Sequence, residues 1–220
     1  MVSKARTSEQ KAFRREEILE AAHDLLSETG YEVFAMAPLA RRAGLAKGTL
    51  YLYFATREEV LLALCTRYVD QWVERILLVL AEPVSDTAYA EAFFDAAVGV
   101  DNLTTLLTRL DQTIEHNVAV EPLIAGKRAF AQQITTLTGP TAEALGLSHD
   151  GAHRLLQALG VLLVGSVMTD QGPSLSAEAL PEDVKHLMQQ FSAKPLFVSN
   201  ACYIIAGMRT ETRPLKKVNA

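Results

Sequence analysis

The amino-acid sequence predicts an all-α fold, and three observations lead to that class. The 220 residues are 49% hydrophobic and 21% charged, a composition typical of a globular protein that buries a core. Apolar residues recur at helical spacing through most of the chain, and no segment shows the sustained period-2 alternation of a half-buried strand. The 12 glycines and 8 prolines are too few for a chain built from hairpins and loops.

The first helices are placed by apolar spacing and by their end signals. Ser8 is expected to cap a first helix, and Gly30 is placed to end it. Two short helices are predicted over residues 36–43 and 47–53, with Gly44 closing the first of them.

A long helix is predicted to begin at a capping box. Thr56 and Glu59 have the required spacing, and the apolar pattern continues to about Leu80, before Pro83. Further helices are expected over residues 86–98, 102–117, 122–145, 150–168 and, with a break near Pro195, 181–208. Residues 172–176 are expected to form a loop and residues 209–220 a frayed tail.

The charge is distributed unevenly along the chain. The net charge is −5, but residues 1–68 carry a net +1 and the remainder −6. No acidic residue lies between Val33 and Arg57, and the first fifteen residues contain five Lys or Arg against Glu9 alone. This asymmetry favours one polyanion-binding end on an acidic protein.

Residues 39–51 have the pattern of a helix-turn-helix, with two short helices joined by a tight turn that contains glycine. The residues expected to pack the two helices together are Leu39, Ala40, Leu45, Leu50 and Phe54. The residues expected on the outer face of the second helix are Lys47, Gly48, Thr49, Tyr51, Leu52 and Tyr53. A cation, hydroxyl donors and an apolar group without a carboxylate suit the major groove of DNA, where polar base edges and the thymine methyl are read.

The stretch from Ile18 to Leu62 resembles the DNA-binding domain of the TetR family of bacterial transcriptional repressors. The resemblance rests on Gly30-Tyr31, residues 40–44, Lys47-Gly48-Thr49-Leu50-Tyr51, Phe54 and Arg57. It implies a helical homodimer with a three-helix DNA-binding head (residues 8–55), a helical effector-binding and dimerisation body (56–209) and a C-terminal tail (210–220). It also implies that the outer face of residues 47–53 contacts DNA and that Arg57 holds a phosphate.

The chain departs from the family pattern at three places. Phe34-Ala35 and Ala37-Pro38 stand where polar residues are usual, and Ala46 replaces a common polar cap. Both short helices are therefore expected to lack a side-chain N-cap. The basic segment from Lys4 to Arg15 is expected to compensate through phosphate or minor-groove contacts.

The body has no motif of its own, so its roles follow from the family. The helix over residues 150–168 is apolar on nearly every face, which predicts burial in the domain or between subunits. The candidate residues for an apolar effector pocket are Tyr68, Trp72, Phe93, Phe94, His116, Phe130 and Met168, most of them expected to be plain core. Cys65 is expected to be a small buried hydrophobe.

Two alternatives to a DNA-binding regulator remain open from the sequence. His149, Asp150 and His153 have zinc-like spacing and allow a metal-dependent hydrolase, although a helix start after Ser148 explains them better. A helical module that binds a protein partner is the other. We expect no catalytic site, metal or cofactor.

The first twenty residues lack the apolar core of a secretion signal, and the apolar run from Leu155 to Met168 is shorter than a membrane span. We therefore expect a cytoplasmic protein with no membrane partner. The predicted function is a ligand-responsive repressor that binds a palindromic operator as a dimer and is released by a small-molecule effector. A regulator that acts without a ligand, or by activation, remains open.

Overall fold

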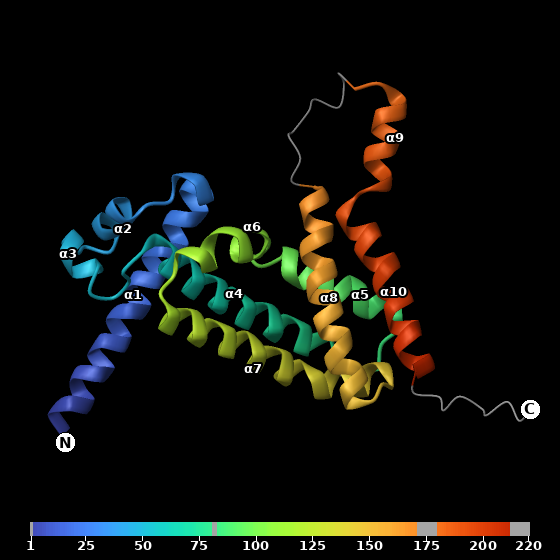
Figure 1. The fold of residues 1–220 in the computed structure, drawn as a ribbon, viewed down its shortest axis with the longest axis horizontal. Helices are drawn as coiled ribbons and strands as arrows, with labels where there is room; N and C mark the ends of the chain where they lie inside the picture. The colour runs from blue at the N-terminus through green and yellow to red at the C-terminus, as the bar shows by residue number, and fades with distance from the viewer. Residues whose placement is uncertain (1, 81–82, 171–179, 212–220) are drawn as a thin grey trace, which may run out of the picture. The chain divides into compact units, whose positions relative to one another are not determined.

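The computed structural model describes residues 2–80, 83–170 and 180–211, and in these ranges every regular element is helical, as the sequence predicts. The elements in chain order (Figure 1) are α1 (Val2–Val33), α2 (Met36–Arg42), α3 (Lys47–Leu50), α4 (Arg57–Val79), α5 (Asp86–Val98), α6 (Leu103–Arg109), the π-turn η1 (Leu110–Ile114), the 3-10 turn η2 (Glu115–Asn117), α7 (Val120–Leu145), α8 (His149–Thr169), α9 (Glu182–Gln190) and α10 (Ala193–Glu211). The predicted loop over residues 172–176 lies outside the described residues.

The chain forms two compact units that do not follow chain order. The first unit contains residues 1–69 and 101–129, and the second contains residues 70–100 and 130–220. The helices α4 and α7 each contribute to both units.

In the first unit, α1 is longer than expected. It begins at Val2 instead of after Ser8, because residues 2–8 contain no glycine or proline and the helix continues through them. At the other end Gly30 has a φ of +75°, which bends the chain where the sequence predicts the helix to end.

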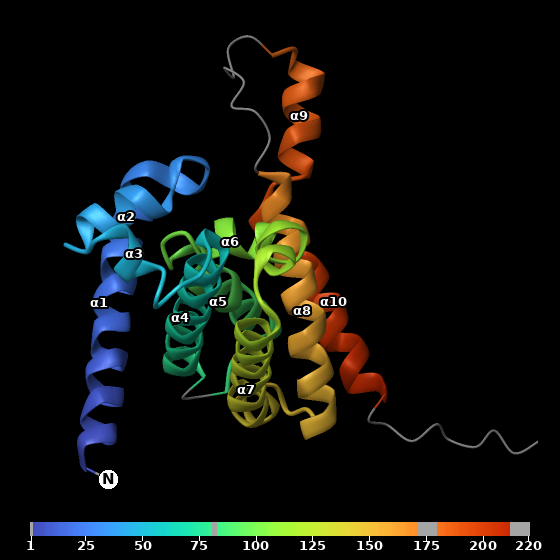
Figure 2. The same cartoon turned by 60° about the vertical axis from the view of Figure 1, so that its left-hand side comes forward.

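The helices α2 and α3 lie beside α1 in both ribbon views (Figures 1 and 2). Their inward side chains Leu39, Leu50 and Phe54 are buried, as predicted. The turn between them needs Gly44, whose φ of +66° is the left-handed conformation that side chains with a Cβ rarely adopt. Across this turn the amide of Leu45 donates to the carbonyl of Ala40 at 2.9 Å.

The predicted capping box opens α4. The Thr56 hydroxyl accepts a hydrogen bond from the Glu59 amide at 3.1 Å, and the Glu59 carboxylate accepts one from the Ala55 amide at 2.7 Å. The first bond satisfies an amide that the first turn of α4 leaves without an intrahelical partner, and the second ties the residue before the Thr56 cap to the helix.

Three more predicted boundaries also differ from the structure. The region 102–117 is not one helix, because the bonding changes after Arg109 to a π-turn and then a 3-10 turn. The break near Pro195 lies earlier, at residues 191–192, because a proline fits in the first turn of α10 where no amide donor is needed. The tail does not begin at Arg209, whose guanidinium donates two 2.6 Å hydrogen bonds to Asp86. Residues 212–220 lie outside the described part of the chain.

The second unit is organised around α8, α10 and α5, and the ribbon views show α8 and α10 side by side (Figures 1 and 2). The sequence predicts an apolar run shorter than a membrane span, but by length and hydropathy the 21-residue helix α8 is long enough to cross a membrane, and 44% of its apolar window is buried inside the fold. The rings of Trp72 and Phe93 meet edge to face at 4.8 Å, and Phe93 stacks on Phe197 at 5.7 Å.

Tyr31 joins three elements of the first unit. Its ring lies between two guanidinium groups, with Arg57 at 4.6 Å and Arg109 at 4.7 Å from the ring centroid. Arg57 also donates a hydrogen bond to the Tyr31 carbonyl. The Tyr31 hydroxyl is buried and has no hydrogen-bond partner among the described residues. The ring, not the hydroxyl, therefore links the end of α1 to α4 and α6.

We expect Tyr31→Leu to lower the free energy of unfolding by about 1–3 kcal/mol, because two cation–π contacts are lost. Tyr31→Phe keeps the ring and removes an unsatisfied hydroxyl, so its stability should equal or exceed that of the wild type. Chemical denaturation followed by circular dichroism measures both variants. A Tyr31→Phe variant as unstable as Tyr31→Leu would contradict this assignment.

Candidate nucleic-acid interface

The outer face of α3 and the turn after it is exposed. Leu52 and Tyr51 keep 74% and 42% of their surface, Lys47 and Gly48 are exposed, and Thr49 and Tyr53 are half-buried. The α-helix ends at Leu50 instead of continuing to Tyr53, because the Leu52 and Tyr53 amides donate to carbonyls three residues back, at 3.1 and 3.0 Å. The structure brings all six predicted residues together in one short segment.

The charge of this face is positive or neutral. Lys47 lies 5.9 Å from the Tyr51 ring centroid, and Arg41 of α2 is also exposed. Arg42, by contrast, binds Glu28 of α1, with one nitrogen–oxygen distance of 2.7 Å. This hydrogen bond lowers the pKa of the Glu28 carboxyl and raises that of Arg42. Arg42 therefore holds α2 on α1, and Lys47 and Arg41 remain for a ligand.

Both short helices lack a side-chain cap, as the sequence predicts. Ala35 and Ala46 occupy the N-cap positions in extended conformations, and neither offers a side-chain oxygen to the amides that follow. Packing of Leu39 and Leu50 into the core holds these helices instead.

Arg57 has a different environment from the one expected for a phosphate ligand. Its guanidinium stacks on Tyr31 and donates to the Tyr31 carbonyl, and its Nε is buried with no hydrogen-bond partner among the described residues. The structure uses this side chain to join α4 to the end of α1. Its contact with phosphate stays a prediction.

The predicted pocket residues fall in both compact units. In the first unit, the Tyr68 hydroxyl and His23 Nδ1 are hydrogen-bonded at 2.8 Å, and burial raises the pKa of Tyr68, while His116 is exposed in η2.

The remaining pocket residues belong to the second unit. The Trp72 indole donates to the Phe93 carbonyl at 3.2 Å, and Phe94 packs against Phe197 at 5.4 Å. Phe130 is half-buried, and Met168 keeps 51% of its surface. A pocket formed by all seven predicted residues stays a prediction.

The histidines considered for zinc lie at the start of α8. Ser148 caps this helix through a 3.0 Å hydrogen bond from the Gly151 amide, and Asp150 is paired with Arg154 at 3.4 Å. His153 contacts Gln157 at 3.3 Å. No cluster of three or more metal-ligating side chains occurs in the described ranges. The helix-start interpretation therefore explains these residues.

Cys65 is fully buried, as expected. Burial, with the nearby Glu115 charge, raises the pKa of the Cys65 thiol to about 12, so the thiolate needed for redox chemistry is not formed at neutral pH.

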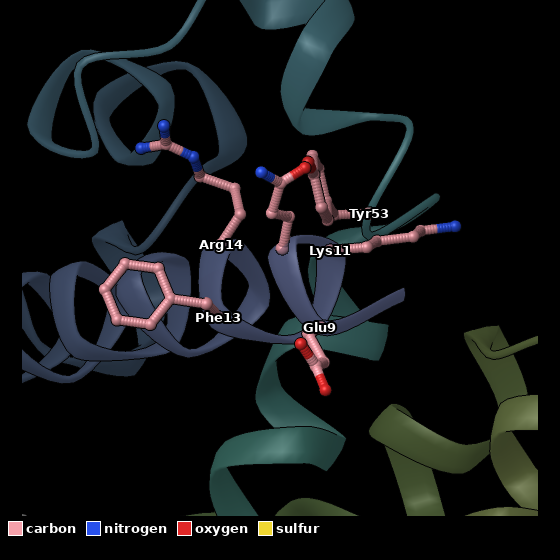
Figure 3. A pocket seen from close by; sticks show the side chains of 6 residues that line it. Glu9, Lys11, Phe13, Arg14 and Tyr53 are labelled. Atoms are coloured by element: carbon pink, nitrogen blue, oxygen red, sulfur yellow. The ribbon is translucent and has the colours of Figure 1, made fainter. Parts of the chain in front are cut away.

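One feature of the interface was not predicted. The side chains of Gln10, Lys11 and Arg14 on α1 line a surface hollow together with Tyr53 (Figure 3), so the basic segment lies next to the end of the predicted recognition helix. Arg15, from the same segment, lies 4.3 Å from the Phe54 ring centroid instead of facing solvent. The run of basic residues in the sequence predicts a cationic segment, but it does not predict which of these side chains are exposed to solvent.

Comparisons with known proteins agree with this arrangement. Residues 18–64 match the bacterial regulatory proteins of the tetR family, and residues 64–212 match the tetracyclin repressor-like C-terminal domain. A fatty acid metabolism regulator protein of Bacillus subtilis (strain 168) is 36% identical over 67 residues, which are 30% of this chain and 34% of the relative. The HTH-type transcriptional activator FasR of Mycolicibacterium smegmatis is 31% identical over 116 residues, 51% of this chain and 53% of the relative.

The chain thus spans about a third to a half of the length of these two curated relatives. A solved structure of a possible TetR family regulator from Streptomyces coelicolor A3(2) has the same fold, with a TM-score of 0.57 and 19% identity, covering 90% of this chain and 99% of the other. The two matched segments together cover residues 18–212, and the second alone is more than half of the chain. The chain belongs to the TetR family of transcriptional regulators.

Proposed function

We propose that the protein is a ligand-responsive repressor that acts in the cytoplasm, binds a near-palindromic operator as a homodimer and leaves it when a small molecule binds the body. The observation that carries the proposal is the exposed face of Lys47, Tyr51 and Leu52, which no carboxylate flanks in sequence between Val33 and Arg57. Lys47 supplies a charged donor, Thr49 and Tyr51 supply hydroxyls, and Leu52 supplies an apolar contact for a thymine methyl.

The dimer is supported by exposed stripes on α8 and α10. On α8, Val161 keeps 77% and Met168 51% of their surface, with exposed Gly165 between them. On α10, Tyr203 keeps 75%, and the nearby Gly207 has open space around the position of a Cβ. Apolar groups and small residues on two packed helices suit the close approach of a second copy, which would cover both stripes. Two heads in such a dimer contact half-sites about 34–36 Å apart, or a multiple of that distance.

The effector class follows from the body and from a relative. Trp72, Phe93 and Phe94 belong to an aromatic cluster inside the second unit, and aromatic side chains of this kind line sites for apolar ligands. The name of the B. subtilis relative points to fatty acid metabolism, so a long-chain acyl group is the first class to test. Such a ligand lowers operator affinity only by the extent to which it prefers a body conformation that does not bind DNA.

We expect Lys47→Ala to weaken binding to a duplex selected from random-sequence DNA by about 1–3 kcal/mol, because a charged contact at the groove is lost. Lys185→Ala, in α9 of the other unit, is the control and should bind as the wild type does. Fluorescence anisotropy at fixed salt compares the three proteins. Equal affinities for all three would remove α3 from the interface.

We expect Val161→Asp to convert the dimer to a monomer at micromolar concentration, because a buried unpaired carboxylate opposes association. Val98→Asp, at an equally apolar site on α5 that keeps 52% of its surface, should remain dimeric. Light scattering measures the mass of each variant. A wild-type monomer, or a Val161→Asp dimer, would contradict the proposed face.

The effector is tested through Trp72, the single tryptophan of the chain. Palmitoyl-CoA should change the tryptophan emission, because Trp72 contacts Phe93 in the aromatic cluster, and should lower affinity for the selected duplex. Free coenzyme A is the control and should do neither. If palmitoyl-CoA alters neither the emission nor the duplex affinity, the acyl class is wrong.

A further inference from the structure

The helix α9 has an apolar face that no described part of its own chain covers. Its apolar residues recur at helical spacing and form one continuous face, the α9 stripe, which consists of Val184, Leu187, Met188 and Phe191. Leu187, Met188 and Phe191 keep 54%, 50% and 54% of their surface, and no residue of α9 is buried. Figures 1 and 2 both show α9 extending past α8 and α10, with no other helix of the second unit beside it.

The polar contacts of α9 do not hold the helix to the rest of the described chain. Lys185 pairs with Glu182 at 3.2 Å. Gln190 contacts His186 at 3.3 Å, so both contacts lie within the helix. An isolated helix shorter than about 12–15 residues is marginal in water, and helices in proteins are stabilised mainly by packing of their apolar face. The nine residues of α9 therefore need a partner on the α9 stripe.

The α9 stripe adjoins the face that is proposed to form the dimer. The amide of Ala193, at the start of α10, donates to the carboxylate of Asp170, at the end of α8, at 3.2 Å, which joins the two helices. Met168, the last residue of the exposed α8 stripe, and Phe191, the last residue of the α9 stripe, each lie two residues from this junction. A second copy that covers the α8 stripe as far as Met168 therefore lies next to α9 as well.

We propose that α9 is an arm that packs the α9 stripe on the body of a second copy of this chain and so extends the dimer interface past the end of α8. This inference rests on the proposed function, because it needs the dimer formed through α8 and α10. A two-fold axis gives both copies the same arm, so two α9 stripes are covered in each dimer. The adjoining face holds the second copy close to α9, which raises its local concentration there.

The charge of α9 favours a protein surface over a lipid surface. Helices that lie on membranes are rich in Lys and Arg on the polar face, which attracts anionic lipids. In α9 the polar positions hold Glu182 and Asp183 against Lys185 alone, so the helix carries a net charge of −1 with His186 neutral. An anionic lipid surface repels such a helix, whereas the apolar surface of a second copy does not.

The test compares Leu187→Glu with Gln189→Glu. Both variants place the same charge on an exposed position of α9, but about 200° apart around the helix, so only the first lies in the α9 stripe. Dimers labelled at the N-terminus with a donor or an acceptor dye are mixed, and energy transfer reports the rate of subunit exchange. We expect Leu187→Glu to exchange about tenfold faster than the wild type, because an apolar contact is lost on each copy. Gln189→Glu should exchange at the wild-type rate.

Photo-crosslinking identifies what covers the α9 stripe. Benzoylphenylalanine in place of Leu187 should join the two chains of the dimer on irradiation, and mass spectrometry should locate the crosslink on the body of the other copy. The same group in place of Gln189 should leave the chains separate. Circular dichroism verifies that all variants keep the helical content of the wild type.

A wild-type exchange rate in Leu187→Glu, or crosslinks confined to one chain, would overturn the arm, while Val161→Asp still tests the dimer through α8 and α10 separately. A wild-type monomer would overturn both. Sedimentation of the wild type with phosphatidylglycerol vesicles that is lost in Leu187→Glu and kept in Gln189→Glu would show a lipid surface as the occupant and would also overturn the proposal.

Discussion

The orientation of the exposed face of residues 47–53 depends on how α3, a helix of four residues, is held in place. One turn of α-helix is not stable alone, and Ala46 gives α3 no side-chain cap. Its orientation comes from Leu50 and Phe54, which are buried in the core that α1 and α2 complete. Burying each of these side chains stabilises the head by roughly 1.5–3 kcal/mol. Because the side chains of Leu50 and Phe54 are held in the core, those of Tyr51 and Leu52 are exposed to solvent.

Contacts within the first unit explain how a protein of negative net charge has a basic surface. Glu28 and Glu32 of α1 engage Arg42 and Arg109, and Arg15 and Arg57 lie against aromatic rings. These cations hold the first unit together. Lys47, Arg41 and Lys11 are exposed and form no ion pair among the described residues, so a net charge of −5 is compatible with a positive surface around α3.

Local signals explain what could be predicted from the sequence. The turn at Gly44, the capping box at Thr56 and the inward packing of Leu50 each depend on neighbours a few residues away. The arrangement of Tyr31 between Arg57 and Arg109 could not be predicted, because Tyr31 and Arg109 are far apart in the chain. The same holds for the anchoring of Arg209 on Asp86, and for the grouping of residues 101–129 with the first unit. The short helix at residues 47–50 was predictable from its local pattern, whereas its end at Leu50 and the hollow beside Tyr53 depend on three-dimensional contacts.

Hydrogen–deuterium exchange of the full chain, with and without a selected duplex, tests the central claim most directly. If the outward face of α3 enters the groove, amides of residues 46–54 should exchange more slowly in the complex, while exchange along α5 stays the same. Unchanged exchange over residues 46–54 in a protein that is saturated with DNA would contradict the account.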